Sequence, residues 1–159
     1  MEFKAKRISR HYRQIINAGS DVILPLLCPD RETEWLDGWE YRMIYSESGR
    51  TELGAIFSTS REGEEDTVWI LTKHDLKAHE VDFARVTPNS RTCILNIAVK
   101  AKDANSSYVD ITYTYTGISD HGNAFIDNYT EEMFLGMATF WEKSMNYFLE
   151  TGKKLRKTA

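Results

Sequence analysis

One stretch near the C-terminus, residues 130–152, constrains the fold more than any other part of the sequence. It reads TEEMFLGMATFWEKSMNYFLETG, and its large apolar residues recur at gaps of three, four and seven positions. This spacing is typical of an amphipathic helix with one broad apolar face. Thr130 can cap the first turn with its hydroxyl, and Gly152 suits the left-handed position that ends a helix. Such a helix would be about 30 Å long, so the rest of the chain must supply a large apolar surface for it.

Most of the remaining sequence alternates between apolar and polar residues, as half-buried strands do. Gly, Pro, Asn and Ser separate the alternating segments, as expected for turns. Before the second strand, the sequence also favours two short helices, at 21–28 and 31–36. The predicted strands cover residues 3–16, 39–46, 53–60, 67–74, 79–87, 92–101 and 107–118. Because one face of these strands is consistently apolar, we expect an α+β fold with one antiparallel sheet covered by the C-terminal helix.

The short turn at residues 75–78 suggests how two of these strands pair. An opposite-charge pair, Lys73 with Glu80, supports the alignment. The predicted register places His74 opposite His79, Thr72 opposite Val81, Ile70 opposite Phe83, and Val68 opposite Arg85. The same alternation assigns the following residues to the inward face: Tyr41, Met43, Tyr45, Leu53, Ala55, Phe57, Val68, Ile70, Val81, Phe83, Cys93, Leu95, Ile97, Val99, Val109, Ile111, Tyr113 and Tyr115.

Composition bounds the class of protein. The chain has 159 residues, of which 42% are hydrophobic and 28% charged, which favours one globular domain over residues 1–159. The net charge of −4 argues against a nucleic-acid-binding protein. No apolar run is long enough for a membrane span and no signal peptide opens the chain. Cys28 and Cys93 have no partner spacing, so we expect free buried thiols and a cytoplasmic protein.

The sequence contains none of the short motifs that identify common classes of enzyme or metal site. It contains no glycine-rich phosphate loop, no CxxC pair, no HExxH and no GxSxG. His74 and His79 face each other in the predicted hairpin, but the nearby carboxylates of Glu80 and Asp82 should point to the opposite face. We therefore expect no metal site and no cofactor, and the sequence identifies no catalytic residue.

Five segments together resemble the START-like superfamily, also called SRPBCC, which includes the birch-pollen allergen and the polyketide cyclases. The segments are VILPLLCP at 22–29, EWLDGW at 34–39, YSESG at 45–49, VWILTKHD at 68–75 and FWEKSMNYFLETGKKL at 140–155. The likeness is greatest to uncharacterised bacterial members and covers nearly the whole chain. It implies a helix-grip fold, in which a curved antiparallel sheet of about seven strands wraps around a long C-terminal helix, with two short helices after the first strand.

The resemblance implies a cavity between the sheet and the long helix that binds a hydrophobic or amphipathic small molecule of lipid, polyketide or aromatic type. A cyclase, dehydratase or hydrolase acting in the same cavity is an alternative, and it requires a polar pair deep in the cavity with a perturbed pKa. A protein-interaction module, similar to the chaperone-activating members, is another. That alternative requires a filled cavity and an outer apolar patch.

The inward aromatic residues could line such a pocket or fill the core outright. Arg85 falls on the same face, and a buried guanidinium requires a partner. That partner could be an anionic ligand group or Glu32, Glu34 or Asp37, and alternatively Arg85 could reach water at the strand end. The candidate ligand-binding residues are Trp35, Trp39, Tyr41, Tyr45, Phe57, Phe83, Arg85, Tyr113, Tyr115, Phe134, Met137 and Trp141.

Two further features of the sequence each allow two interpretations. Gly136 lies inside the long helix, where glycine costs about 1 kcal/mol relative to alanine. It could allow close approach to a strand or leave room for a ligand. Separately, four apolar residues fall together on the predicted outward face, where they would form a homodimer surface or be covered by the chain itself. These four are Ile44, Ile56, Trp69 and Leu71.

Overall fold

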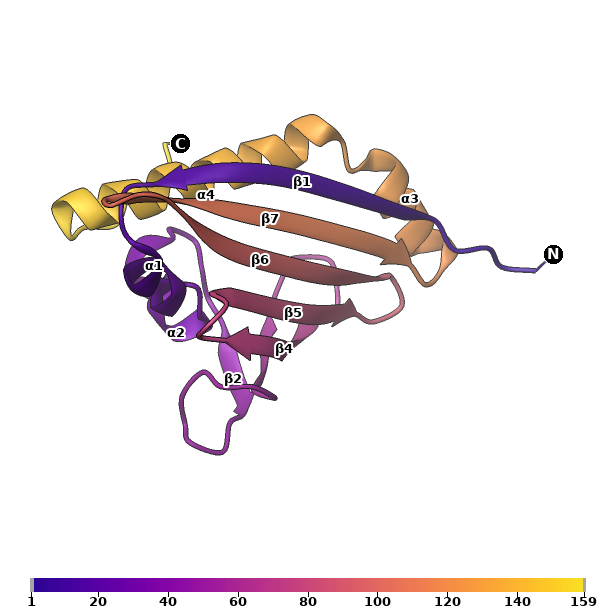
Figure 1. The fold of residues 1–159 in the computed structure, drawn as a ribbon. Helices are drawn as coiled ribbons and strands as arrows, with labels where there is room; N and C mark the ends of the chain where they lie inside the picture. Colours follow the sequence, from indigo (N-terminus) through magenta and orange to yellow (C-terminus); the bar gives the residue numbers. More distant parts are fainter. Residues whose placement is uncertain (1, 159) are drawn as a thin grey trace.

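Seven strands form one antiparallel sheet in the computed structural model, which describes residues 2–158 (Figure 1). The order across the sheet is β1-β7-β6-β5-β4-β3-β2. The strands are β1 (Arg7–Ile16), β2 (Arg42–Tyr45), β3 (Ile56–Thr59), β4 (Thr67–Asp75), β5 (Glu80–Thr87), β6 (Arg91–Asp103) and β7 (Ser106–Gly117). The helices are α1 (Ser20–Leu26), α2 (Pro29–Trp35), α3 (Asp120–Asn128) and α4 (Glu131–Thr151). The predicted α+β arrangement with two short helices after the first strand is confirmed.

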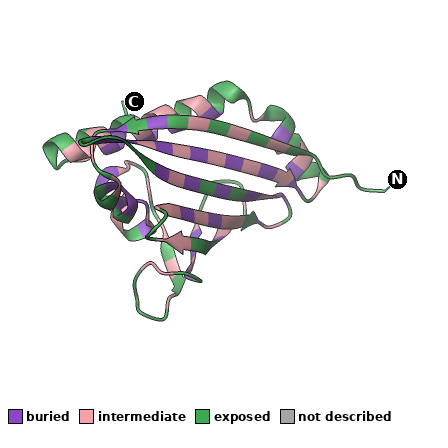
Figure 2. Cartoon of the chain, viewed as in Figure 1, coloured by how far each residue is buried: buried purple, intermediate pink, exposed green. Residues whose placement is uncertain are grey.

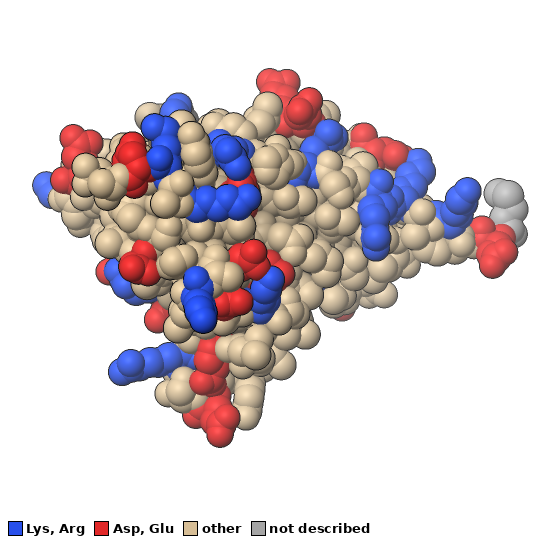
Figure 3. All heavy atoms as spheres, viewed as in Figure 1, with Lys and Arg blue, Asp and Glu red and all other residues tan. Residues whose placement is uncertain are grey.

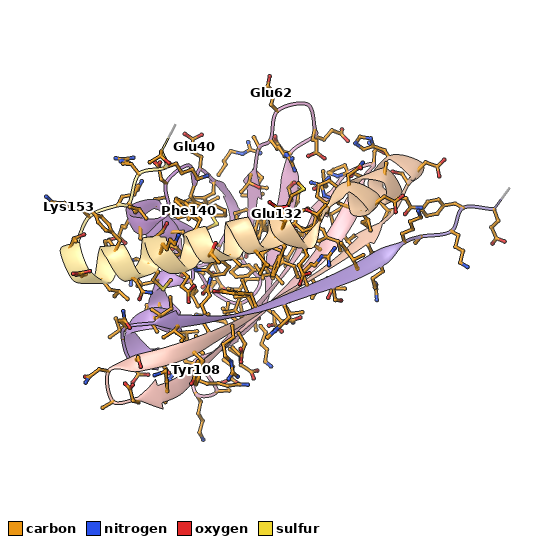
Figure 4. All side chains as sticks on the ribbon, turned by 90° about the horizontal axis from the view of Figure 1, so that it is seen from above. Glu40, Glu62, Tyr108, Glu132, Phe140 and Lys153 are labelled. Carbon is orange, nitrogen blue, oxygen red and sulfur yellow. The ribbon has the colours of Figure 1, made fainter. Side chains whose placement is uncertain are left out.

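The long C-terminal helix α4 forms where the sequence predicts it. Thr130 accepts a hydrogen bond from the Met133 amide at 3.2 Å, and Gly152 ends the helix with a φ of 72°. Its apolar face is buried, and α4 contacts β1 and α2. In Figure 1 it lies behind β1 and β7, and in Figure 4 it runs from near Glu132 to near Lys153 along the molecule. The helix therefore covers one edge of the sheet's inner face, and α2 closes another side.

The central strands β6 and β7 follow the predicted alternation, visible as banding in Figure 2. Their inward residues, from Cys93 to Val99 and from Val109 to Tyr115 at every second position, are buried. Both cysteines are free, but only Cys93 is buried, whereas Cys28 is partly exposed. Positive and negative side chains are interspersed on the face in Figure 3, so no continuous patch of one charge forms there.

The predicted register of the β4–β5 pair is wrong. His74 is paired with Val81, two residues from its predicted partner, and beyond a register shift between Leu71 and Lys73 the pairs are Leu71 with Phe83 and Trp69 with Arg85. A β-bulge adds one residue to one strand, and a shift of one residue reverses which side chains point inward. Consequently Val68 and Ile70 do not take the predicted inward positions. The Lys73–Glu80 ion pair does form, although Lys73 stands opposite Asp82.

The same error overturns the predicted dimer surface. Trp69 is 6% and Leu71 is 1% exposed, and both belong to the hydrophobic core. Only Ile44 among the four residues is largely exposed, whereas Ile56 is partly buried. The outward cluster of Ile44, Ile56, Trp69 and Leu71 therefore does not exist, and the outer face of β4, β5 and β6 presents Ile70, Val86 and Ile94 instead.

The strands β2 and β3 are shorter than predicted, which changes two further assignments. A register shift between Met43 and Tyr45 leaves Tyr45 58% exposed, and Leu53 lies in the turn before β3 and is also exposed. Both residues were expected on the inward face. An irregular edge pair is the cause, since alternation fails beyond a bulge.

The helix α3 has no counterpart in the predicted elements. Ser119 caps it by accepting a hydrogen bond from the Gly122 amide at 3.0 Å. At Gly122, an added Cβ would lie 1.6 Å from the carbonyl oxygen of Ser90. This glycine thus allows α3 to pack directly on the turn between β5 and β6.

Candidate functional site

A cavity of about 520 Å³ lies between the inner face of the sheet, α2 and α4. This volume is within the range of small-molecule sites. Its walls are largely aromatic, with residues from the sheet, α2 and its following loop, Tyr129, and α4, where Phe140 marks one side in Figure 4. The aromatic lining residues are Trp35, Trp39, Phe57, Trp69, Phe83, Tyr113, Tyr115, Tyr129, Phe140 and Trp141.

The aromatic wall on the β3–β5 side is held by ring-to-ring packing. Trp69 stacks on Phe57 with ring centroids 5.2 Å apart and meets Trp39 edge-on at 5.8 Å. It also meets Phe83 edge-on at 5.9 Å. These distances are those of favourable aromatic pairs. The wall is therefore pre-formed and offers ring faces and edges to a bound molecule.

Three of the four wall tryptophans already use their indole nitrogens in hydrogen bonds within the protein. Trp35 donates to the Leu26 carbonyl at 3.0 Å, Trp39 to the Pro29 carbonyl at 2.9 Å, and Trp69 to Thr59 Oγ1 at 2.9 Å. The buried Nε1 of Trp141 has no partner among residues 2–158. Trp141 also lines the cavity, and a buried donor without a partner is costly.

Arg85 points into the cavity from β5. Its Nη2 donates to the Tyr115 hydroxyl at 2.6 Å, and its guanidinium carbon lies 4.7 Å from the Trp69 ring and 5.4 Å from the Tyr113 ring. Within the described part of the chain, no carboxylate forms an ion pair with it. Arginine stays protonated in proteins, so a cation remains in the cavity with aromatic contacts and no counter-ion.

None of the three carboxylates considered as partners of Arg85 forms an ion pair with it. Glu34 pairs with Arg31 on the surface of α2, and Asp37 pairs with Arg156 at 3.0 Å. Glu32 does line the cavity, but it makes no ion pair with Arg85. Of the open alternatives, neutralisation by any of these carboxylates is therefore wrong.

Glu32 is the second polar feature of the cavity. Its carboxylate accepts no hydrogen bond and forms no ion pair within residues 2–158. Burial, with a smaller contribution from the nearby Asp30 charge, raises the pKa of Glu32 to about 8. The cavity thus holds a carboxyl group that keeps its proton at neutral pH, in addition to the Arg85 cation.

Nine of the predicted ligand-binding residues line the cavity, namely Trp35, Trp39, Phe57, Phe83, Arg85, Tyr113, Tyr115, Met137 and Trp141. Tyr45 is exposed, Tyr41 packs beside Trp39 and Phe57 outside the cavity, and Phe134 is buried against Tyr113 at 5.6 Å. These three residues are therefore not part of the cavity wall.

Sequence reasoning missed several residues of the wall. Trp69 was assigned to the opposite face because the bulge in β4 was not foreseen. Glu32 was considered only as a partner of Arg85. Phe140 could have been found, because it lies on the same side of α4 as Gly136 and Met137.

Gly136 has open space beside it. A Cβ built at this position has no neighbour within 4 Å, and Gly136 lines the cavity. Of the two interpretations, close approach to a strand is therefore excluded, and the glycine leaves room at the cavity wall.

The two histidines of the β4–β5 hairpin lie away from this cavity. His79 Nε2 lies 2.8 Å from Asp21 Oδ1, and His74 is paired in the sheet with Val81. Residues 2–158 contain no group of three side chains arranged to hold a metal ion.

Comparison with known proteins identifies solved structures of similar fold but no related sequence. The chain matches no protein-family model and no curated protein sequence. Its structure is similar to a norcoclaurine synthase point mutant from Thalictrum flavum, with a TM-score of 0.70 and 14% identity over 96% of this chain and 100% of that one. The ZhuI aromatase/cyclase from Streptomyces sp. R1128 gives 0.66 and 8% over 94% and 100%, and Ara h 8.0201 gives 0.66 and 9% over 92% and 99%.

These neighbours agree with the architecture built from the residues, and no helix within residues 2–158 is long and apolar enough to cross a membrane. At such low identity the likeness concerns the fold. The chain therefore has the same helix-grip fold as these proteins.

Proposed function

We propose that the cavity binds a small amphipathic molecule with a planar apolar body and an anionic group. The observation that carries this proposal is Arg85, a cation inside an aromatic cavity without a carboxylate partner in the described chain. A ligand carboxylate or phenolate would supply the missing charge through charge-assisted hydrogen bonds.

The walls favour an aromatic body for this ligand. Rings of Trp39, Trp69 and Phe83 offer both faces and edges, which suit offset and edge-on packing against another ring. One structural neighbour, norcoclaurine synthase, has been solved with dopamine and hydroxybenzaldehyde bound, both small aromatic compounds. This likeness supports the ligand class for the present chain.

The protein-interaction alternative lacks one of its two requirements. It needs a filled cavity, whereas about 520 Å³ is open. Of its predicted outer cluster, Trp69 and Leu71 are core residues, although Ile70, Val86 and Ile94 are exposed on the outer face. Small-molecule binding is the better-supported class.

Binding of matched compounds to wild type and Arg85→Met tests the proposal. Aryl carboxylates, such as naphthoate and phenylpyruvate, are compared with their neutral amides by titration calorimetry and thermal melting. We expect the carboxylates to bind wild type at least tenfold more tightly than the amides, and Arg85→Met to remove that preference. The exposed Arg7 on β1 gives a control, Arg7→Met, which removes the same charge away from the cavity.

Stability of the empty protein gives a second readout. Since no protein carboxylate loses its partner, Arg85→Met should be at least as stable as wild type without ligand, whereas breaking a buried ion pair costs about 3–5 kcal/mol. Equal affinity for carboxylates and amides in wild type would contradict the proposal.

A further inference from the structure

The proposed binding of an anion at Arg85 does not involve Glu32, the other polar group of the cavity. Its carboxyl lines the same cavity from α2, whereas Arg85 reaches in from β5, and the two are not ion-paired. A molecule between them would meet a cation on one side and an unpartnered carboxyl group on the other. A cation and a carboxyl group that line the same apolar cleft are typical of catalytic sites.

The charged and titratable groups that face Glu32 come from several elements. Asp30 lies on α2, Arg85 on β5 and Tyr113 on β7, and Asp37 and Lys157 also line the cavity. Asp37 is already paired with Arg156 and accepts from the Lys157 amide. Burial and Asp30 favour the protonated carboxyl, so the pKa of Glu32 rises to about 8.

We propose that the cavity is an active site for proton transfer, in which Glu32 is the general base that removes a proton from the carbon beside a ligand carbonyl. This inference rests on the proposed binding function, and it narrows the ligand to an aromatic compound with an enolisable carbonyl. A 3-aryl-2-oxo acid, such as phenylpyruvate, fits best, because it has enolisable protons at C3 and its carboxylate and carbonyl oxygens lie side by side and can both face the Arg85 guanidinium.

The step balances without a further reactant. The Glu32 carboxylate takes the proton, so the carbon–hydrogen bond breaks and an oxygen–hydrogen bond forms on Glu32. The electron pair of the broken bond forms the carbon–carbon double bond of an enolate, and the carbonyl pair moves to oxygen. Return of a proton from Glu32 to that oxygen gives the enol, and return to carbon regenerates the ketone.

The surroundings stabilise the charge that develops on the oxygen. Arg85 is held in place by Tyr115, whose hydroxyl oxygen accepts from the guanidinium and retains its own proton for donation. Such fixed donors act strongly in a cavity with few polar groups. A carboxylate whose pKa is about 8 is also a stronger base than an ordinary glutamate, and a small fraction is ionised at neutral pH.

Deuterium uptake by phenylpyruvate in D₂O tests the proposal directly. The signal of the C3 protons is followed by NMR, and the rate in buffer alone is subtracted. We expect wild type to accelerate exchange, with a rate that rises through about pH 8 as Glu32 loses its proton. Glu32→Gln should lower the protein-dependent rate by about 10²–10⁴-fold, the usual contribution of a general base.

The matched control is Glu34→Gln, which removes the same charge from the exposed side of the same helix. With this variant, the C3 protons of phenylpyruvate should exchange at the wild-type rate. Circular dichroism and calorimetric binding of phenylpyruvate show whether Glu32→Gln remains folded and occupied.

The outcomes separate the two proposals. Phenylpyruvate binding to wild type without accelerated exchange would overturn proton transfer and leave the binding function standing. Exchange that persists in folded Glu32→Gln would overturn the role of Glu32. Failure of every aryl carboxylate to bind wild type would overturn the binding function and, with it, this inference.

Discussion

The burial of Glu32 has a consequence for stability that requires no ligand. In the folded protein the pKa of this carboxyl is raised from 4.5 to about 8, mainly by burial. Between these two values the unfolded chain loses the Glu32 proton and the folded protein retains it. Folding stability must therefore fall as pH rises through this interval, because the unfolded state binds fewer protons.

The size of the stability change follows from the difference between the pKa values of Glu32 in the unfolded and folded states. About 3.5 pH units separate the two values, and at 1.36 kcal/mol per unit they correspond to at most about 5 kcal/mol. Glu32 lies at a cavity wall and is partly accessible, so solvent reduces this figure. We expect Glu32→Gln, which cannot ionise, to match wild type near pH 5 and to be about 2–5 kcal/mol more stable near pH 9.

Urea unfolding at five pH values between 5 and 9 measures this difference. Other titrating groups contribute equally to wild type and variant, so they cancel in the comparison. Glu34→Gln is the matched control, because it removes a carboxyl group from the exposed side of the same helix. Parallel curves for Glu32→Gln and wild type would show that the Glu32 carboxyl is solvated, and would refute the reasoning.

Three further predictions concern packing. Trp141→Ala should destabilise the protein by about 3–5 kcal/mol in denaturant melts, because Trp141 packs on Trp35 at 6.3 Å in the core; a loss below about 1 kcal/mol would contradict this. Gly136→Ala should raise stability by about 1 kcal/mol, since the new methyl group meets open space, and a lower melting temperature would be inconsistent with that space. Gly122→Ala should destabilise by several kcal/mol because its Cβ would collide with the Ser90 carbonyl, so wild-type stability would disprove that close approach.

The sequence alone determined the elements whose pattern is long and regular. The helix α4 carries both of its capping signals within its own sequence, and β6 and β7 alternate over many residues without interruption at their inward positions. Local hydrogen bonding and side-chain periodicity are sufficient in such segments. For the same reason Arg85, whose strand β5 pairs regularly with β6, was assigned to the correct face.

Only the tertiary structure decided which face of β4 points inward and which groups meet in the cavity. One bulge after Leu71 turns Trp69 from a predicted surface residue into part of the aromatic wall. Tyr45 leaves the inward face at a similar irregularity. Glu32 becomes a cavity residue because α2 packs against α4 at the cavity wall, a long-range contact without a local signal. Alternation has a period of two residues, so one inserted residue reverses a face, and its place depends on strand pairing that a local pattern does not encode.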